Sequence, residues 1–488
     1  MSQLDDTAPI GAIAPASRRL PVATKLAYGV GSIAYGVKDN GFSTLLLLFY
    51  NQVIGLPAQM VGLAIMVALI FDAFADPLIG HLSDNTRSRW GRRHPFMYAA
   101  ALPVGALYLL LWNPPTGHDS VTLVYLVVVA ILVRTAISCY EVPSSALAPE
   151  LTTDYHERTS VLGYRYLFGW TGGMGMLLLT FGIFLAPSPQ FPVGQLNPHG
   201  YRTYAVVAAV VMVAAILLSA LGTHRQIARL PKAPPIKGTL SGVLVALRNR
   251  NFLILMATGV FSYTSQGLSF ALTTYFYTYL WQFPASVLLI YTLAVMVGVA
   301  IGFVIASRVS RWLGKRNTAI LFLMLAIPAA TAPYILNYLN LFPARGSAAL
   351  LPLLLASTLI ATALGVGVAI LGESMMSDVV EESQARSGQR TEGVFFAGSF
   401  FMKKSVSGIG IFLSGALLAL AGFPEAAKPG AVPEAVLDRL TLSFAGLTIA
   451  CGVLAIAALT RFSITQAGHE ERLARMAGTG SSRRTDAS

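Results

Sequence analysis

The chain has 488 residues, of which 55% are hydrophobic and only 11% are charged. Soluble domains carry roughly 25% charged residues, so this composition excludes an ordinary soluble protein and indicates a polytopic membrane protein. The net charge of +12 comes from cations in the segments between apolar runs, which is typical of topology signals. We therefore expect the lipid bilayer as the surroundings, and no nucleic-acid partner.

Long apolar runs, each near the roughly 20 residues that cross a bilayer, predict twelve transmembrane helices. Their expected ranges are 24–50, 57–83, 95–114, 120–147, 159–186, 202–222, 252–280, 286–308, 317–339, 347–374, 392–421 and 440–461. The predicted fold class is an all-α polytopic membrane protein of two pseudo-symmetric six-helix bundles, the major facilitator fold. The expected divisions are a tail 1–23, a bundle 24–222, a basic central loop 223–251, a bundle 252–461 and a tail 462–488.

Charge in the short loops predicts the orientation of the chain. The loop after the second span carries Arg87, Arg89, Arg92 and Arg93, whereas the segments 51–59 and 281–286 carry no charge. Positive charge favours the cytoplasmic side, so we expect a plasma-membrane protein whose termini and central loop are cytoplasmic. The first twenty residues lack an apolar signal core, so the first span is expected to be retained.

A repeated motif relates the two halves. Ser88-Arg-Trp-Gly-Arg-Arg93 follows the second span, and Ser310-Arg-Trp-Leu-Gly-Lys-Arg316 follows the eighth. Such a repeat predicts two related bundles that rock about a central site. Glycine-rich stretches such as Gly365-Val-Gly367 lack the lysine of a phosphate loop, so we interpret them as places where membrane helices approach closely. Neither an enzyme nor a cofactor is expected.

Ionisable residues inside the spans mark the candidate site, because such charges are costly in a bilayer and usually line an ion or substrate path. Asp72 and Asp76 lie four residues apart, and therefore on one face of the second span. Ser138 and Glu141 share a face of the fourth span in the same way. The other ionisable residues of this kind are Asp39, Glu373, Lys38, Arg134, Arg165, Lys403 and Lys404.

Two interpretations of the acids stay open. The oxygens of the two spans would close a cage around Na⁺, or the acids would bind a proton, because adjacent carboxylates repel one another. Alternatively, the acids form structural ion pairs with Lys404, Arg134 or Arg165, and Arg134 is expected to pair with Glu141. Asp39, rather than its neighbour Lys38, is expected to face the cavity between the bundles.

The order of these residues resembles the glycoside-pentoside-hexuronide:cation symporters of the major facilitator superfamily, over residues 24–461. The matching motifs are Lys38-Asp39, Asp72-Ala-Phe-Ala-Asp76-Pro77, Gly80-x-x-x-Asp84, Ser88 to Arg93, Glu141-Val-Pro143, Ser377-Asp378-Val-Val380, Arg390-Thr-Glu-Gly393 and Lys404. The resemblance implies cation:substrate symport by alternating access, with Na⁺ or H⁺ as the coupling ion and a small-molecule substrate. A functional monomer is expected.

The resemblance also implies roles for single residues. The implied cation ligands are Asp72, Asp76, Ser138 and Glu141, and the substrate-binding residues expected in this chain are Lys38, Asp39, Arg165, Glu373 and Lys404. The expected gating residues are Gly80, Asp84, Arg92, Arg93 and Asp378, with Gly80 permitting a close helix approach and the charged groups holding the seam between the halves.

Two positions depart from the family pattern and leave the substrate class open. Sugar-binding members carry a tryptophan shortly after the acid of the fourth span and another in the tenth, where this chain has Ser145 and Ala369. The chain also resembles sodium-dependent lysophosphatidylcholine symporters around Asp72, Asp76 and Lys404. A sugar or glycoside is the first hypothesis, and an amphiphile such as a lysophospholipid is the second. A sensor or an intramembrane enzyme is a third, less favoured alternative.

Overall fold

A computed structural model of the protein describes residues 20–115, 117–152, 154–227, 247–387 and 392–464. Within these ranges the fold is all-helical, with twelve helical spans that coincide with the twelve predicted ones. Ten of the helices are long and apolar enough to cross a membrane. Most of both predicted tails, most of the central loop and Arg390 of the family motif lie outside the described residues.

The first span is a chain of short segments instead of one helix. It consists of α1 (Val22–Val30), α2 (Ser32–Asn40), a π-helical turn (Gly41–Leu45), α3 (Leu46–Leu48) and a second π-helical turn (Phe49–Val53). Beside the break, a Cβ on Gly29 would lie 2.8 Å from the ring of Phe168 in α7 (Tyr155–Leu179). This crowding confirms that glycine permits close packing of the first span.

The remaining elements of the amino-terminal half are α4 (Ala58–Asn85), α5 (His94–Leu111), α6 (Asp119–Leu151), α7, which continues as Thr180–Phe184, and α8 (Pro198–His224). The helix α8 begins earlier than predicted because the side chain of Asn197 accepts a hydrogen bond from the backbone N–H of His199, at 3.0 Å. Such a cap, followed directly by proline, starts a helix efficiently.

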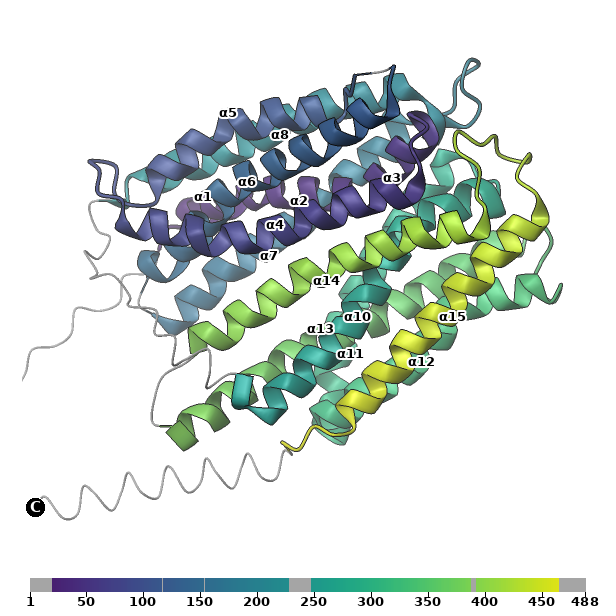
Figure 1. Ribbon diagram of the computed structural model, residues 1–488. Helices are drawn as coiled ribbons and strands as arrows, with labels where there is room; N and C mark the ends of the chain where they lie inside the picture. Colours follow the sequence, from purple (N-terminus) through teal and green to yellow (C-terminus); the bar gives the residue numbers. More distant parts are fainter. Residues whose placement is uncertain (1–19, 116, 153, 228–246, 388–391, 465–488) are drawn as a thin grey trace, which may run out of the picture.

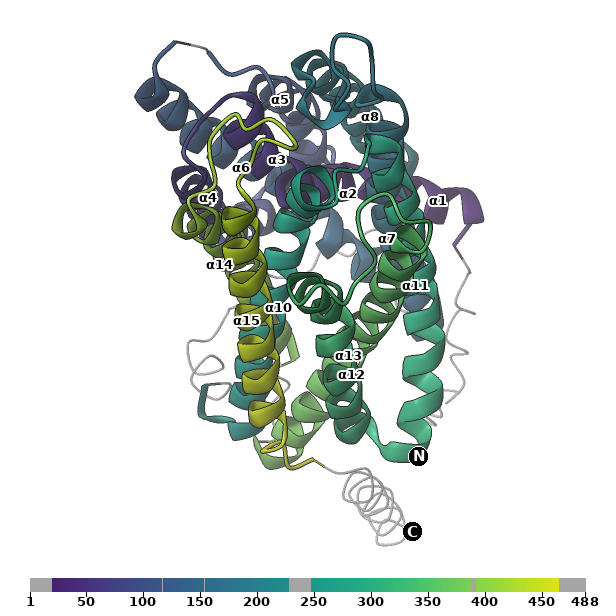
Figure 2. The same ribbon diagram turned by 90° about the vertical axis from the view of Figure 1, so that its right-hand side faces the viewer.

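The carboxy-terminal half contains α10 (Arg250–Tyr275), continued as Phe276–Leu280, then α11 (Ala285–Leu313), α12 (Lys315–Tyr338), α13 (Leu350–Ser387), α14 (Glu392–Ala421) and α15 (Glu434–Leu459). The helix α13 runs well past the predicted end at residue 374, because a polar helix can continue beyond the bilayer. Figures 1 and 2 show the purple-to-blue and green-to-yellow halves as two separate groups of helices.

The two halves meet along α4 and α14, which lie side by side at the seam (Figure 1). Small residues permit the approach. A Cβ on Gly408 of α14 would stand 3.0 Å from the Cβ of Leu69, and one on Gly62 of α4 would stand 3.1 Å from the carbonyl oxygen of Ile411. Both distances are tighter than ordinary packing, so these two glycines place the charged residues of α4 and α14 next to one another.

Hydrogen bonds between the halves gather at the end of the molecule that carries the uncharged loops. The amide of Gln52 donates to the carbonyl of Pro424 at 3.1 Å and accepts from the hydroxyl of Tyr279 at 2.8 Å and the N–H of Ala427 at 2.9 Å. The hydroxyl of Tyr275 donates to Asn51 at 2.9 Å. We call Asn51, Gln52, Tyr275 and Tyr279 the polar seal; it joins the halves at this end.

Candidate cation and substrate site

Asp72 is the most completely enclosed acid of the candidate site. Its side chain is fully buried between α4 and α6. The guanidinium of Arg134 donates to Oδ2 from Nη2 at 2.8 Å and from Nε at 3.1 Å, and the hydroxyl of Ser138 donates to Oδ1 at 2.7 Å. The structure therefore brings Asp72 and Ser138 together as predicted. It pairs Arg134 with Asp72, however, where the sequence led us to expect Glu141.

Lys404 joins this cluster from the opposite half. Its ammonium nitrogen lies 2.5 Å from Oδ2 of Asp76 and 3.3 Å from Oδ2 of Asp72. The side chain of Asp76 is 24% exposed, and its Oδ1 has no hydrogen-bond partner among the described residues. One positive group of α14 thus contacts both carboxylates of α4, and Asp72 is shared between Lys404 and Arg134.

Glu141 stands slightly apart from the two aspartates. Its Oε1 lies 3.8 Å from Nη2 of Arg165, and its Oε2 has no hydrogen-bond partner within the described part of the chain. In those parts there is no group of three or more acidic, histidine or cysteine side chains near enough to share a metal ion. The cage of Asp72, Asp76 and Glu141 is therefore not closed in this conformation.

Lys38 and Asp39 point in different directions from α2. The side chain of Lys38 is buried and lies 4.4 Å from the ring centroid of Tyr35. The side chain of Asp39 is 52% exposed and keeps only a distant ion pair of 3.8 Å with Lys38. Asp39 is thus the member of the pair that an incoming molecule can reach.

Glu373 of α13 and Lys403 of α14 form a second ion pair, within the carboxy-terminal half. Both side chains line a cavity of about 310 Å³ enclosed mainly by α10 to α15, with Trp170 of α7 also at its wall. Ala369 lies in the same wall. Asp39 and Arg165 do not line this cavity; the expected substrate residues are therefore divided between the two halves of the described structure.

The expected gating residues occupy matching places in the two halves. Arg93 lies 2.5 Å from Asp84 and 3.0 Å from Glu150, and Arg92 lies 2.8 Å from the same Glu150. In the second half, Lys315 lies 2.7 Å from Asp378. In the first half, Arg92 and Arg93, which follow the second span, pair with Glu150 at the end of the fourth span. In the second half, Lys315, which follows the eighth span, pairs with Asp378 near the end of the tenth.

These ion pairs lie inside their own halves in this conformation, and not across the seam where we expected them. Gly80 likewise differs from expectation. A Cβ there would lie 3.5 Å from Val142 of α6, which is an ordinary contact. The close approach between the halves is made instead by Gly62 and Gly408.

The cavity was missed by sequence reasoning, whereas the Arg134–Asp72 and Lys404 pairs are among the ion pairs that the structural alternative had named without choosing between them. The Arg134–Asp72 pair depends on how α4 and α6 are rotated about their axes, which spacing alone does not determine. The cavity had a detectable signal, because α13 places Gly365, Ala369 and Gly372 three to four residues apart on one face. Gly367, by contrast, packs as interpreted: a Cβ there would stand 2.6 Å from the ring of Phe322.

Comparison with known proteins identifies the family of the chain. The family model described as MFS/sugar transport protein matches residues 27–466. An isoprimeverose transporter of Lactiplantibacillus pentosus is 26% identical over 409 residues, covering 83% of this chain and 81% of that protein. An uncharacterized symporter of Synechocystis sp. is 34% identical over 236 residues, which are 47% of this chain and 42% of that protein.

Solved structures place the fold in the same group. The crystal structure of a D-xylose-proton symporter superposes with a TM-score of 0.65 at 14% identity, covering 92% of this chain and 99% of that one. At this identity the likeness speaks for the fold alone, while the family match covers most of the sequence. The chain therefore belongs to the MFS/sugar transport family of the major facilitator superfamily, in agreement with its resemblance to the glycoside-pentoside-hexuronide:cation symporters, and it is a multi-pass membrane transporter and not an enzyme.

Proposed function

We propose that this protein is a cation-coupled symporter of the plasma membrane, which moves Na⁺ or H⁺ together with a sugar or glycoside by alternating access and functions as a monomer. The observation that carries the proposal is the contact of Lys404 with both Asp72 and Asp76, at 3.3 Å and 2.5 Å. Because Lys404 belongs to one half and the aspartates to the other, the charge state of this cluster is linked to how the halves sit together.

The cluster provides a mechanism for coupling. A cation that binds the carboxylates replaces the ammonium of Lys404 as their counter-charge and releases α14 from α4. Two prolines add acceptors for it. Pro77 and Pro143 lie inside α4 and α6, and a helical proline removes the N–H that would pair with the carbonyl four residues earlier. The carbonyl oxygens of Ala73 and Cys139 therefore lose their usual helical donor and are available to bind an incoming cation.

The proposed cation ligands are Asp72, Asp76, Ser138 and Glu141. Asp76 and Glu141 each have a buried oxygen without a hydrogen-bond partner within the described ranges, as expected of groups that receive a ligand in another state. The proposed substrate residues are Lys38, Asp39, Arg165, Glu373 and Lys404. Asp39 would accept hydrogen bonds from sugar hydroxyls, and Arg165 would donate to them.

The activities for which two similar proteins are named support a sugar as the class of substrate. One relative is an isoprimeverose transporter, and one structural neighbour is a D-xylose-proton symporter. An amphiphile such as a lysophospholipid remains the second candidate, favoured by one observation: the large cavity beside Glu373 and Lys403 has walls of Phe261, Leu323, Ile327 and Val368.

The proposed orientation puts the basic loops in the cytoplasm. The polar seal then closes the extracellular end, and the conformation described here is inward-facing. On this proposal, Asp84, Arg92, Arg93 and Asp378 exchange partners during the transport cycle, and form contacts across the seam only when the cavity opens outward.

Uptake into membrane vesicles tests the proposal. Asp76→Asn removes one carboxylate of the cluster and is expected to abolish stimulation of sugar uptake by Na⁺ or by a proton gradient. Asp119→Asn is the matched control, because Asp119 is an exposed acid at the start of α6. Cation-stimulated uptake that persists in the Asp76→Asn variant would refute the assignment.

A further inference from the structure

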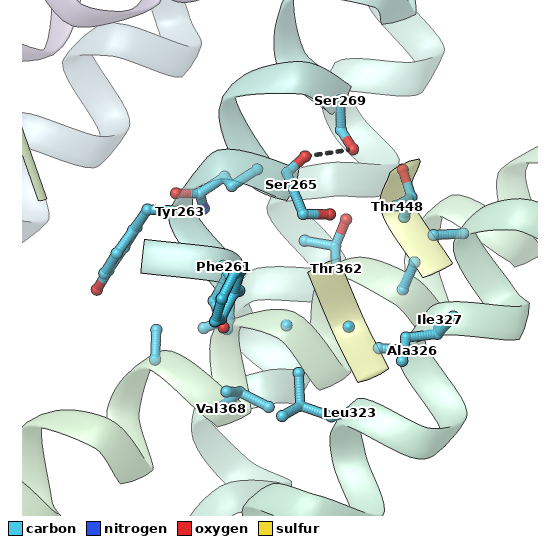
Figure 3. A pocket seen from close by; sticks show the side chains of 18 of the residues that line it. Phe261, Tyr263, Ser265, Ser269, Leu323, Ala326, Ile327, Thr362, Val368 and Thr448 are labelled. Atoms are coloured by element: carbon cyan, nitrogen blue, oxygen red, sulfur yellow. Dashed lines mark hydrogen bonds between the residues drawn. The ribbon is translucent and has the colours of Figure 1, made fainter. Parts of the chain in front are cut away.

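The cavity of the carboxy-terminal half has two chemically different sides. Figure 3 shows Leu323, Ala326 and Ile327 on one side and Ser265, Ser269 and Thr448 on another. Its volume of about 310 Å³ falls at the lower end of the range of pockets that enclose small organic ligands. A cavity of this kind fits a compact apolar group that also carries a hydrogen-bonding atom.

Three of its hydroxyl groups have no hydrogen-bond partner within the described residues. They are Oγ1 of Thr448, in a residue that is 4% exposed, Oγ of Ser262 and the phenolic oxygen of Tyr277. Other hydroxyls of this wall donate to their own helix; Ser269, for example, donates to the carbonyl of Ser265 at 2.9 Å, and Thr273 to that of Ser269 at 2.7 Å. A buried hydroxyl without a partner is costly, so Thr448 and Ser262 point to a ligand that carries oxygen or nitrogen.

Small residues keep the cavity open. A Cβ added at Gly365 or Gly372 of α13 would meet nothing within 4 Å, and both residues line the cavity. These glycines therefore do not serve helix packing, unlike Gly367. Since glycine destabilises a helix interior by about 1 kcal/mol relative to alanine, the absence of side chains here comes at a cost that the fold itself does not explain.

The cavity extends toward the acid of the first span. A smaller pocket lies between the halves, and Phe270, Thr273 and Tyr291 line both spaces. That pocket also includes Asn40, the residue next to Asp39. At another edge the cavity reaches Lys403, whose neighbour Lys404 contacts the aspartates. The cavity and the smaller pocket therefore share part of their walls, and the smaller pocket touches the first span beside Asp39.

We infer that the cavity binds the apolar part of the transported substrate, and that the substrate is a neutral glycoside with an aromatic aglycone bearing a polar atom. The inference rests on the proposed function, which places the sugar beside Asp39 and Arg165. The aglycone then lies between the wall of Leu323 and Ile327 and the small face of α13, and its polar atom pairs with the hydroxyl of Thr448.

Binding of matched probes to the purified full-length protein tests this inference. The probes are methyl and 4-nitrophenyl glycosides of the same set of sugars, and affinity is read from thermal stabilisation as a function of concentration. We expect the nitrophenyl glycoside of the recognised sugar to bind at least about tenfold more tightly than its methyl counterpart, because an aromatic ring is removed from water.

Gly365→Leu fills the cavity and should remove the preference for the nitrophenyl glycoside while leaving affinity for the methyl glycoside unchanged. Gly446→Leu is the matched control, since Gly446 is exposed in α15, has open space at its Cβ and does not line the cavity. This control should keep the full preference. Thr448→Val serves as a milder second variant, and should narrow the difference between nitrophenyl and unsubstituted phenyl glycosides several-fold.

The outcomes separate the two proposals. Equal affinity for methyl and nitrophenyl glycosides, or a preference that survives both Gly365→Leu and Thr448→Val, overturns the aglycone site and leaves sugar symport standing. Binding of no glycoside by the wild-type protein overturns the sugar proposal together with the aglycone site. Stabilisation by lysophosphatidylcholine alone, lost in Gly365→Leu, would replace the glycoside with an amphiphile and refute the inference as stated.

Discussion

Replacing Asp72 by asparagine should destabilise the folded protein more than the same replacement at Asp76. The side chains of Asp72 and Arg134 are 0% and 2% exposed, and Nη1 of Arg134 already lacks a hydrogen-bond partner among the described residues. Removing one member of a buried ion pair costs about 3–5 kcal/mol, because the other charge is left uncompensated. The amide oxygen of asparagine still accepts from Arg134, so we expect a loss of about 3 kcal/mol.

Two further variants show how much of this loss comes from the unpaired charge of Arg134. Asp72→Asn combined with Arg134→Met removes both charges and should recover most of the loss, because replacing a whole buried pair is often neutral. Asp76→Asn should cost about 1 kcal/mol or less, since Asp76 is partly exposed and one oxygen has no partner within the described residues. Unfolding of the purified protein by increasing SDS concentration measures all three. A single Asp72→Asn variant as stable as the wild type, or a double variant no more stable than the single, would refute the reasoning.

Four other substitutions test neighbouring parts of the account. Lys404→Met removes the resident positive charge and should tighten cation binding about tenfold, measured from the cation dependence of intrinsic fluorescence; unchanged cation affinity would remove Lys404 from the site. Arg93→Ala should cost about 2 kcal/mol in the same SDS titration and Arg92→Ala less, because Arg93 is more deeply buried and contacts both Asp84 and Glu150; equal losses would contradict this ranking. Gln52→Ala breaks the polar seal and should increase labelling, by an impermeant reagent added from outside, of a cysteine placed on the cavity side of the seal; unchanged labelling would show that the seal does not hold the inward-facing state.

The helices were predictable because each needs only a long apolar run, and twelve such runs can be recognised in the sequence. The ends of the helices were less predictable. The cap of Asn197 on α8 and the polar extension of α13 to Ser387 lie outside the apolar signal. The break of the first span near Gly31 was also missed, since glycine is common in membrane helices that stay continuous.

At the site, periodicity predicted that Asp72 and Asp76 share a face, and the family resemblance implied that Ser138 lies near them. It could not predict which base each acid contacts, because that depends on the rotation of α6 and on the seam between α4 and α14. The large cavity is a related case. Its lining comes from α10 to α15 together with Trp170 of α7, and only the small face of α13 is visible in one stretch of sequence.

The reciprocal coupling of cation and sugar binding tests the central claim most directly. The affinity of the purified protein for its sugar is measured with and without saturating cation, and the affinity for the cation with and without saturating sugar. Symport through the Asp72, Asp76 and Lys404 cluster predicts that each ligand tightens the other by the same factor, and that Asp76→Asn reduces both factors to about one. Sugar affinity that is indifferent to Na⁺ and to protons in the wild-type protein would contradict the account.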